Sequence, residues 1–461
     1  MQVSQQKIQL ELALIGGATG EAQSPLRQGT ETCAARTDLE HPVDAFAMME
    51  IIVERENMKK ALKRVQCNKG APGVDGMTVK DLSAYLIDRW PVIRDQLLAG
   101  TYKPQPVRRV EIPKASGGKR LLGIPAVIDR LIQQAVMQVL QAEWDPTFSE
   151  HSHGFRPGRS AHGAVKEAQA HIAAGNKVVV DIDLEKFFDR VNHDILMGLV
   201  ARRAQDPRIL KLIRRYLAAG AMMDGLVSPT EEGVPQGGPL SPLLSNLMLD
   251  QLDKELERRG HNFVRYADDA NIYVRSRRAG ERVMASVEQF LSRKLKLRVN
   301  AEKSAVDTPV RRKFLGFSFL NRKGPKRRIA PQALSRMKRR VRVITQRSRG
   351  RSLEQIVEEL STYLRGWRGY FGICETPSVL QAADQWIRRR LRSLIWKQWR
   401  HSHKRFAELC HRGVGRELAL QTVGSPHGPW RLSNSPALAI AIGNNFFKSL
   451  GLLSLHEAKS T

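Results

Sequence analysis

Hydrophobic and polar positions along the chain follow two periods, which predict a mixture of helices and strands. Alternation over 176–184 predicts a strand whose one side carries Asp181 and Asp183. Residues 106–125 and 262–275 each contain two alternating stretches joined by turn residues, which predicts a hairpin in each segment. A helical period recurs over Ala45 to Cys67, Val127–Gln141, 192–219, 239–258 and 279–297, and through most of the chain from Arg311 to Trp399.

The order of these elements predicts an α+β fold that ends in an all-helical basic region. Residues 1–45 show little periodicity and contain a stretch rich in Gly, Ser, Thr and Gln, so we expect a partly flexible N-terminal extension. The mixed part of the chain then covers 46–320, and the helical basic part covers 321–461.

The net charge of the chain indicates which class of partner it binds. The 461 residues include 75 Lys and Arg against 46 Asp and Glu, a net charge of +29, which favours a polyanion such as nucleic acid. Between Arg311 and Arg351 there are 16 basic residues and no acidic ones. A second basic run, 388–405, carries Trp396 and Trp399, which suit either an RNA surface or the core side of an amphipathic helix. We expect both interpretations to hold in part.

Cysteine spacing and apolar run length exclude other classes. The four cysteines form no CxxC pair and no zinc-type cluster, which indicates reduced thiols in a cytosolic protein. No apolar run approaches the roughly 18 residues of a membrane span, and the first residues do not resemble a secretory signal. We therefore expect a cytosolic protein without a membrane partner.

Two acidic segments contain the candidate catalytic residues. Asp181 and Asp183 lie in the predicted strand, and Asp268 and Asp269 lie where the second hairpin turns. An Asp-Asp pair alone is more often a solvated loop, and two acids without Gly suit a primed turn poorly. Carboxylates brought together on neighbouring strands need cations, and Mg²⁺ is the natural ion for such hard oxygen ligands. Two ions about 3.5–4 Å apart would activate a 3′-hydroxyl and stabilise a leaving pyrophosphate.

Ordered blocks of sequence extend along most of the chain: GAPGVDGMTV (70–79), IPKASGGKRLLGIPAVIDRLIQQAV (112–136), HSHGFRPGRSAHGAV (151–165), DIDLEKFFDRVNHD (181–194), GVPQGGPLSPLLSNLMLDQLD (233–253), RYADD (265–269), LKLRVNAEKS (295–304), FLGFSF (314–319), YLRGWRGYFG (363–372) and GPWRLSNSPAL (428–438). In these blocks and their order the chain resembles the group II intron-encoded reverse transcriptase/maturases of bacterial type. The resemblance covers roughly 46–455 and rests on the ordered blocks rather than on Tyr-Ala-Asp-Asp at 266–269 alone.

The resemblance implies a right-hand polymerase, with fingers and palm over 46–320 and an all-α thumb/maturase domain over 321–461. It implies RNA-directed DNA synthesis from dNTPs on an RNA template with a DNA primer, with two Mg²⁺ ions that Mn²⁺ can replace. It also implies binding of structured intron RNA for splicing, and of target DNA during retrohoming. Because no zinc-type cysteine cluster follows, we expect no endonuclease domain.

The same resemblance assigns site residues. Asp183, Asp268 and Asp269 match the metal carboxylates, Leu184 would lend a backbone carbonyl, and Asp181 stays an alternative to Asp183. Phe187 is expected in the core. The residues expected at the nucleotide are Lys114, Arg120, Phe188, Gln236 and Gly237. The residues expected at nucleic acid are Arg156, Arg159, Lys303, Arg327, Arg328, Lys338, Arg339, Arg340, Arg388, Arg389, Lys397 and Arg400.

Some of these assignments have alternative interpretations. Lys114 and Arg120 would also suit a solvated hairpin face, and Lys303 an exposed surface. For the whole chain, the alternatives are a non-catalytic RNA-binding splicing factor and a domesticated relative in host defence or DNA repair. The sequence does not determine the oligomeric state.

Overall fold

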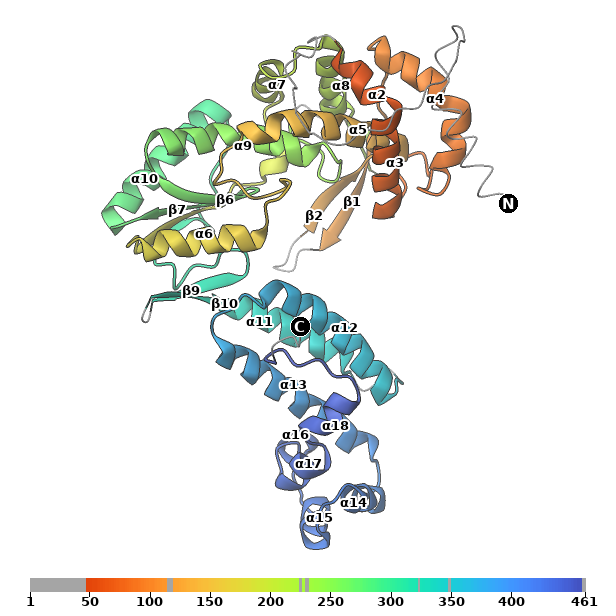
Figure 1. The fold of residues 1–461 in the computed structure, drawn as a ribbon, viewed down its shortest axis with the longest axis vertical. Coiled ribbons are helices and arrows are strands. Elements are labelled where there is room, and N and C mark those ends of the chain that lie inside the picture. The colour runs from red at the N-terminus through yellow and green to blue at the C-terminus, as the bar shows by residue number, and fades with distance from the viewer. Residues whose placement is uncertain are drawn as a thin grey trace, which may run out of the picture. The chain divides into compact units, whose positions relative to one another are not determined.

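The computed structural model describes residues 47–113, 119–223, 226–228, 232–321, 324–346 and 350–457 (Figure 1). The predicted extension, 1–45, lies outside these ranges, and so does Lys114. The chain forms two compact units. The first unit comprises the chain up to Ser160 together with Val180–Val274 and Arg278–Val306, and the second comprises Ala161–Val179, Arg275–Arg277 and the chain from Asp307.

The helices of the first unit follow the predicted periodicity, with breaks that local sequence explains. The helix predicted over 192–219 is two helices, because Pro207 begins a new one and the Asp206 side chain accepts a hydrogen bond from the Arg208 backbone N–H at 2.9 Å. The helices are α2 (Met48–Val53), α3 (Arg55–Asn68), α4 (Leu82–Leu98), α5 (Val127–Trp144), α7 (His193–Ala201), α8 (Pro207–Ala218), α9 (Ser241–Arg258) and α10 (Arg277–Phe290).

A four-stranded sheet carries the first predicted hairpin. Its strand order is β2-β1-β4-β5, where β1 is antiparallel to β2 and parallel to β4. The strands are β1 (Val107–Pro113), β2 (Lys119–Ile124), β4 (Ala221–Met223) and β5 (Leu226–Ser228). The hairpin over 106–125 is therefore confirmed. The sequence did not predict β4 and β5, since three residues are too few to show a period.

A second four-stranded sheet contains both acidic segments. Its order is β6-β7-β3-β8, and β6 pairs with β7 as the predicted hairpin. The strands are β3 (Val178–Ile182), β6 (Asn262–Tyr266), β7 (Asp269–Val274) and β8 (Ala305–Asp307). Burial of Val180, Ile182 and Phe263 fixes the register, because a one-residue slip would turn these apolar side chains to the other face. The order places β3 directly beside β7, which begins with Asp269.

The second unit is helical from Pro331 onward, as predicted, but a hairpin that the sequence analysis missed precedes this helical part. The hairpin strands are β9 (Phe317–Asn321) and β10 (Pro325–Ile329). The helices are α6 (Ala161–Ala173), α11 (Pro331–Ile344), α12 (Leu353–Phe371), α13 (Pro377–Gln398), α14 (Ser402–His411), α15 (Arg416–Val423), α16 (Pro429–Leu432), α17 (Pro436–Ala441) and α18 (Asn444–Ser449).

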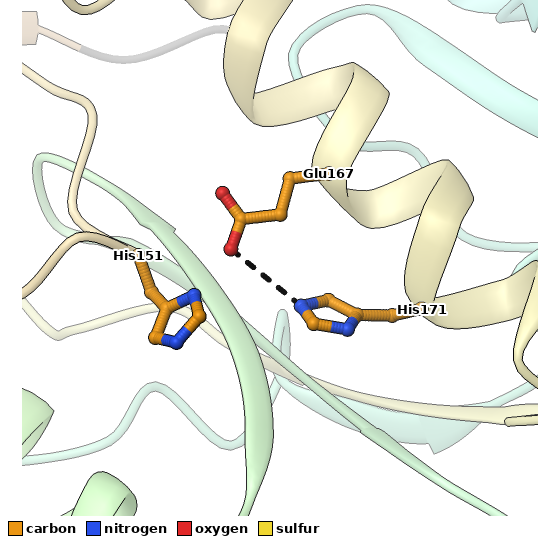
Figure 2. Close-up of side chains that lie close together, drawn as sticks. All are labelled: His151, Glu167 and His171. Carbon is orange, nitrogen blue, oxygen red and sulfur yellow. Dashed lines mark ion pairs between the residues drawn. The ribbon is translucent and has the colours of Figure 1, made fainter.

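Local side-chain contacts stabilise these helices. Ser352 and Gln355 form a reciprocal capping box at the start of α12. On α6, Glu167 and His171 stand one turn apart with 3.6 Å between Oε1 and Nε2 (Figure 2), an ion pair whenever the imidazole is protonated.

The tryptophans of the second basic run belong to the core of the second unit. Trp396 is 1% exposed and Trp399 is 6% exposed, and both lie among the buried side chains of α11 to α13. The Arg405 guanidinium carbon lies 4.9 Å from the Trp396 ring centroid, and that of Arg412 lies 5.7 Å from the Trp399 centroid. The core interpretation is therefore confirmed for both rings.

Candidate active site

Asp183 directly follows β3 and is fixed through its backbone by the turn before β8. The Ser304 hydroxyl oxygen lies 3.0 Å from the Asp183 N–H, which donates to it, and 3.3 Å from the Asp183 carbonyl. The Asn300 N–H donates to the same carbonyl at 2.8 Å. The strand end is therefore held by a segment more than a hundred residues away in sequence, which leaves the carboxylate to project from a rigid backbone.

Asp268 and Asp269 lie at the tip of the β6–β7 hairpin. Tyr266 pairs with Asp269, so Ala267 and Asp268 form the two-residue turn. Ala267 has a φ of +57°, a left-handed conformation that costs a residue with a Cβ about 1–2 kcal/mol. The turn is therefore of a primed type, although it contains no glycine. Contacts with surrounding residues must stabilise this backbone conformation.

Lys303 pairs with one of the three carboxylates and lies within the electrostatic influence of the other two. Lys303 Nζ lies 2.8 Å from Asp183 Oδ2. The pKa of Lys303 is raised above its ordinary value, first by the hydrogen bond to Asp183 and further by the charges of Asp183, Asp268 and Asp269. One ammonium group therefore neutralises Asp183 and is attracted by the charges of Asp268 and Asp269. The donor set, hard carboxylate oxygens with partial exposure, fits a divalent ion such as Mg²⁺.

Asp181 and Asp183 have different surroundings. The Asn271 amide on β7, oriented so that both its atoms find partners, donates to Asp181 Oδ1 at 3.1 Å. Asp181 therefore has a hydrogen-bond partner within the sheet, whereas Asp183 contacts the Lys303 ammonium. This difference favours Asp183 as the first metal ligand.

Leu184 presents its backbone suitably for a metal. Leu184 pairs with Val299 in an antiparallel bridge whose two hydrogen bonds use the backbone groups of the flanking residues, Asp183 and Glu185. In such a pair the central residue's own carbonyl points away from the partner segment. The Leu184 side chain is 5% exposed, so packing fixes this orientation.

The elements expected at the nucleotide lie next to one another. The Gly123 N–H on β2 donates to the Gln236 carbonyl at 2.8 Å. Gly237 has a φ of +133°, and a Cβ there would stand 2.6 Å from the Gly123 carbonyl oxygen, so only glycine fits this loop against the hairpin. The Val234 N–H donates to the Phe188 carbonyl at 2.6 Å, which joins the same loop to the segment after β3.

The individual nucleotide residues are placed as follows. Phe188 is half-buried, whereas Phe187 is 3% exposed and belongs to the core, as expected. Arg120 lies on β2 opposite Ile112. Lys114 lies outside the described residues. The backbone placement of Arg120, Phe188, Gln236 and Gly237 agrees with a shared nucleotide site, which remains a prediction.

Arg156 requires a correction. It was expected to contact template phosphates, but its side chain is buried and its guanidinium is used internally. Nε donates to Asp145 Oδ1 at 2.9 Å, Nη1 donates to the Ser152 carbonyl at 2.9 Å and to that of Ser149, and Nη2 donates to the Asp145 carbonyl at 2.8 Å. Arg156 therefore fixes the 149–152 loop instead of binding phosphate.

The remaining predicted nucleic-acid residues differ in their availability. Arg159 is exposed and donates to the Glu150 carbonyl at 3.0 Å. Arg327 pairs with Glu375 at 3.3 Å, and the Arg389 guanidinium lies 4.2 Å from the Trp430 ring centroid. Arg339, Arg340 and Arg400 are exposed, and Arg328, Lys338, Arg388 and Lys397 are half-buried.

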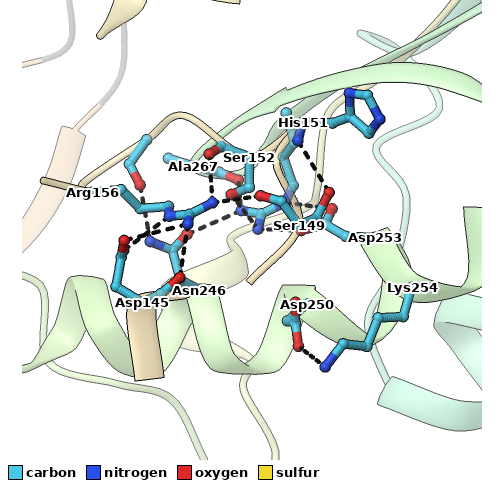
Figure 3. A network of polar contacts seen from close by, with 12 residues as sticks. Asp145, Ser149, His151, Ser152, Arg156, Asn246, Asp250, Asp253, Lys254 and Ala267 are labelled. Atoms are coloured by element: carbon cyan, nitrogen blue, oxygen red, sulfur yellow. Dashed lines mark hydrogen bonds and ion pairs between the residues drawn. The ribbon is translucent and has the colours of Figure 1, made fainter. Parts of the chain in front are cut away.

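Sequence reasoning missed a buried polar network beneath the hairpin tip. Figure 3 shows Ser152, Asn246, Asp253 and Ala267 gathered in this network. Their common partner is Arg265, which is 1% exposed and lies on β6. Two features of the sequence could have indicated this network. One is an arginine inside the apolar run FVRY, and the other is the pair of acids on the apolar face of α9, which precedes this run.

Comparison with known proteins agrees with this geometry. Residues 112–319 match the family "Reverse transcriptase (RNA-dependent DNA polymerase)", and residues 334–412 match "Group II intron, maturase-specific domain". Protein YkfC of Escherichia coli (strain K12) is 34% identical over 299 residues, covering 56% of this chain and 78% of YkfC. The group II intron-encoded protein LtrA of Lactococcus lactis subsp. cremoris is 39% identical over 195 residues, covering 42% of this chain and 32% of LtrA.

A solved structure titled "Partial Cas6-RT-Cas1--Cas2 complex" is 24% identical and covers 54% of this chain and 43% of that one, with a TM-score of 0.33. The chain belongs to the family of group II intron reverse transcriptases that carry a maturase-specific domain, and it is an RNA-directed DNA polymerase. Within the described ranges, no helix has the length and apolar character needed to cross a membrane.

Proposed function

We propose that Asp183, Asp268 and Asp269, with the Leu184 carbonyl, hold two Mg²⁺ ions at the end of β3 and the tip of the β6–β7 hairpin. When bound, such ions activate the primer 3′-hydroxyl and stabilise the leaving pyrophosphate, and Mn²⁺ would substitute. The observation that carries this proposal is the placement of one ammonium group, Lys303, in the field of all three carboxylates. Lys303 itself would lie near the primer end.

The remaining groups would bind and orient the dNTP. Lys114 and Arg120 on the first hairpin would neutralise the triphosphate as its negative charge grows. Phe188 would pack beneath the sugar and exclude a ribose 2′-hydroxyl. Gln236 and Gly237 would support the new base pair, since Gly237 lets the backbone approach closely.

We assign residues 46–320 to fingers and palm, and 321–461 to a thumb/maturase domain that binds structured intron RNA. Exposed cations such as Arg339, Arg340 and Arg400 would meet RNA phosphates, and Arg159 would meet the template. The proposed biological role is splicing and retrohoming of the encoding intron, with target DNA as a further partner, in the bacterial cytosol.

Primer extension tests the polymerase proposal. We expect dNTP incorporation on an RNA template with a DNA primer to need Mg²⁺ or Mn²⁺, to prefer dNTPs over NTPs, and to be lost in Asp268→Ala. Normal extension by Asp268→Ala would refute the assigned centre. Splicing of a group II intron by the same variant would show that RNA binding acts separately from catalysis, whereas an active enzyme without any intron RNA partner would favour the domesticated alternative.

A further inference from the structure

Arg265 is a buried charge directly before the acidic hairpin tip. Its guanidinium has five N–H groups, and all of them have acceptors. Nε donates to Asp253 Oδ1 at 2.8 Å, and one Nη2 proton goes to Asp253 Oδ2 at 2.5 Å. The other acceptors are Ser152 Oγ at 2.7 Å, Asn246 Oδ1 at 3.1 Å and the Ala267 carbonyl at 2.9 Å.

The bond to Ala267 reaches the turn itself. Ala267 is the residue with left-handed backbone, and its carbonyl is bonded by an arginine two positions earlier on the same chain. A buried carbonyl that lost this donor would cost free energy, so the bond favours the turn conformation that places Asp268. A guanidinium anchored at four other points cannot follow the turn if it moves.

The anchors come from separate segments of the first unit. Asp253 and Asn246 lie on α9, and the Asn246 amide also donates to the Gly154 carbonyl at 2.9 Å. Ser152 forms a parallel bridge with Arg265, and the His153 N–H donates to the Arg265 carbonyl at 2.9 Å. The helix α9 and the 152–154 segment therefore meet at the Arg265 side chain, which also bonds the Ala267 turn. Figure 3 shows Ser152, Asn246, Asp253 and Ala267 close together.

We propose that Arg265 is a positioning residue for the polymerase reaction, which holds the Ala267–Asp268 turn in its left-handed conformation and so sets the geometry of Asp268 and Asp269 toward the metal ions. This inference rests on the proposed function. It goes beyond it in assigning the rigidity of the centre to a side chain that touches neither substrate nor metal.

A lysine at position 265 would keep the charge but lose the fork that spans Asp253, Ser152 and Ala267. We expect Arg265→Lys to lower the single-turnover extension rate at saturating dNTP by about 10- to 100-fold, because misplacement of catalytic groups by about 1 Å has effects of this size. We also expect a several-fold higher Mg²⁺ concentration at half-maximal rate, with primer–template affinity nearly unchanged.

A neighbouring pair, the half-buried Arg203 with the buried Asp250, provides the matched control. Arg203 donates to Asp250 on the same helix at 2.9 Å, and Asp250 is fully buried, but this pair bonds Thr147 and Lys254 instead of the turn. Arg203→Lys should therefore lower thermal stability as Arg265→Lys does, while leaving the Mg²⁺ dependence of the folded enzyme at its wild-type value.

If Arg265→Lys does not fold, Ser152→Ala removes a single acceptor of the same guanidinium and should raise the Mg²⁺ requirement in a milder form. The proposal is overturned if the folded variants lose activity only in proportion to their unfolded fraction, with wild-type Mg²⁺ dependence. Failure of the proposed function is a different result: there Asp268→Ala extends primers normally, whatever Arg265→Lys does.

Discussion

Replacement of Gly154 by alanine tests how tightly the catalytic turn is held. Gly154 is buried in the 151–154 segment, which runs alongside β6. A Cβ at this position would overlap the Ala267 backbone nitrogen and stand 3.0 Å from both the Ala267 Cα and the Tyr266 carbonyl carbon. Each of these atoms belongs to the turn backbone, so no flexible side chain can move aside.

The size of the effect follows from contact distances. The new methyl carbon would stand 2.2 Å from the Ala267 nitrogen. Non-bonded heavy atoms prefer about 3.5–4.0 Å, so the turn must move by about 1 Å or more away from it. Displacement of catalytic groups by about 1 Å can cost about 10²-fold in rate, which corresponds to about 2.7 kcal/mol in the activation free energy. Overpacking should also reduce the free energy of unfolding by about 1–3 kcal/mol.

Single-turnover primer extension measures this effect, with thermal denaturation to confirm folding. Gly198→Ala is the matched control, because a Cβ at this exposed position of α7 would meet nothing within 4 Å. That variant should keep the wild-type rate and gain up to about 1 kcal/mol of stability. A folded Gly154→Ala enzyme with the wild-type rate would refute the reasoning that the 151–154 segment fixes the turn.

Two further predictions concern charge. Lys303→Met should destabilise the metal-free protein by about 0.2–1 kcal/mol, since the Lys303–Asp183 ion pair is partly exposed. Mg²⁺ should then raise the melting temperature of this variant more than that of the wild type. An equal Mg²⁺ effect on both proteins would contradict the prediction. Burial raises the pKa of Asp129 to about 6, so the folded state binds this proton more tightly than the unfolded chain, and stability falls as pH rises from about 4 to about 6. Denaturant unfolding should show this loss in wild type and not in Asp129→Asn, and parallel pH profiles would argue against it.

The sequence predicted elements well where a period was long enough to see. The strand at 178–182, the hairpins at 107–124 and 262–274, and the helices α5 and α9 all show many repeats of one pattern. The short strands β4, β5 and β8 and the hairpin β9–β10 were missed, because three to five residues carry little periodic signal. Pairing with distant segments, not local preference, makes them strands.

The acidic centre was predictable for a different reason. Asp183, Asp268 and Asp269 stand in apolar surroundings, where carboxylates are costly without a partner. The same cost applies to Arg156 and Arg265, yet their buried partners, such as Asp145 and Asp253, are recognisable only once the fold brings them together. A basic residue in a basic chain therefore looks like a phosphate contact until its burial is known.

The most direct test of the polymerase centre is single-turnover extension by Asp183→Asn beside Asp181→Asn, in Mg²⁺ with an RNA template and a DNA primer. Asp183 faces the Lys303 ammonium, whereas Asp181 contacts the Asn271 amide within the sheet. The account predicts a loss of at least about 10³-fold for Asp183→Asn, equal to about 4 kcal/mol, and a much smaller loss for Asp181→Asn. Near wild-type extension by a folded Asp183→Asn enzyme would contradict it.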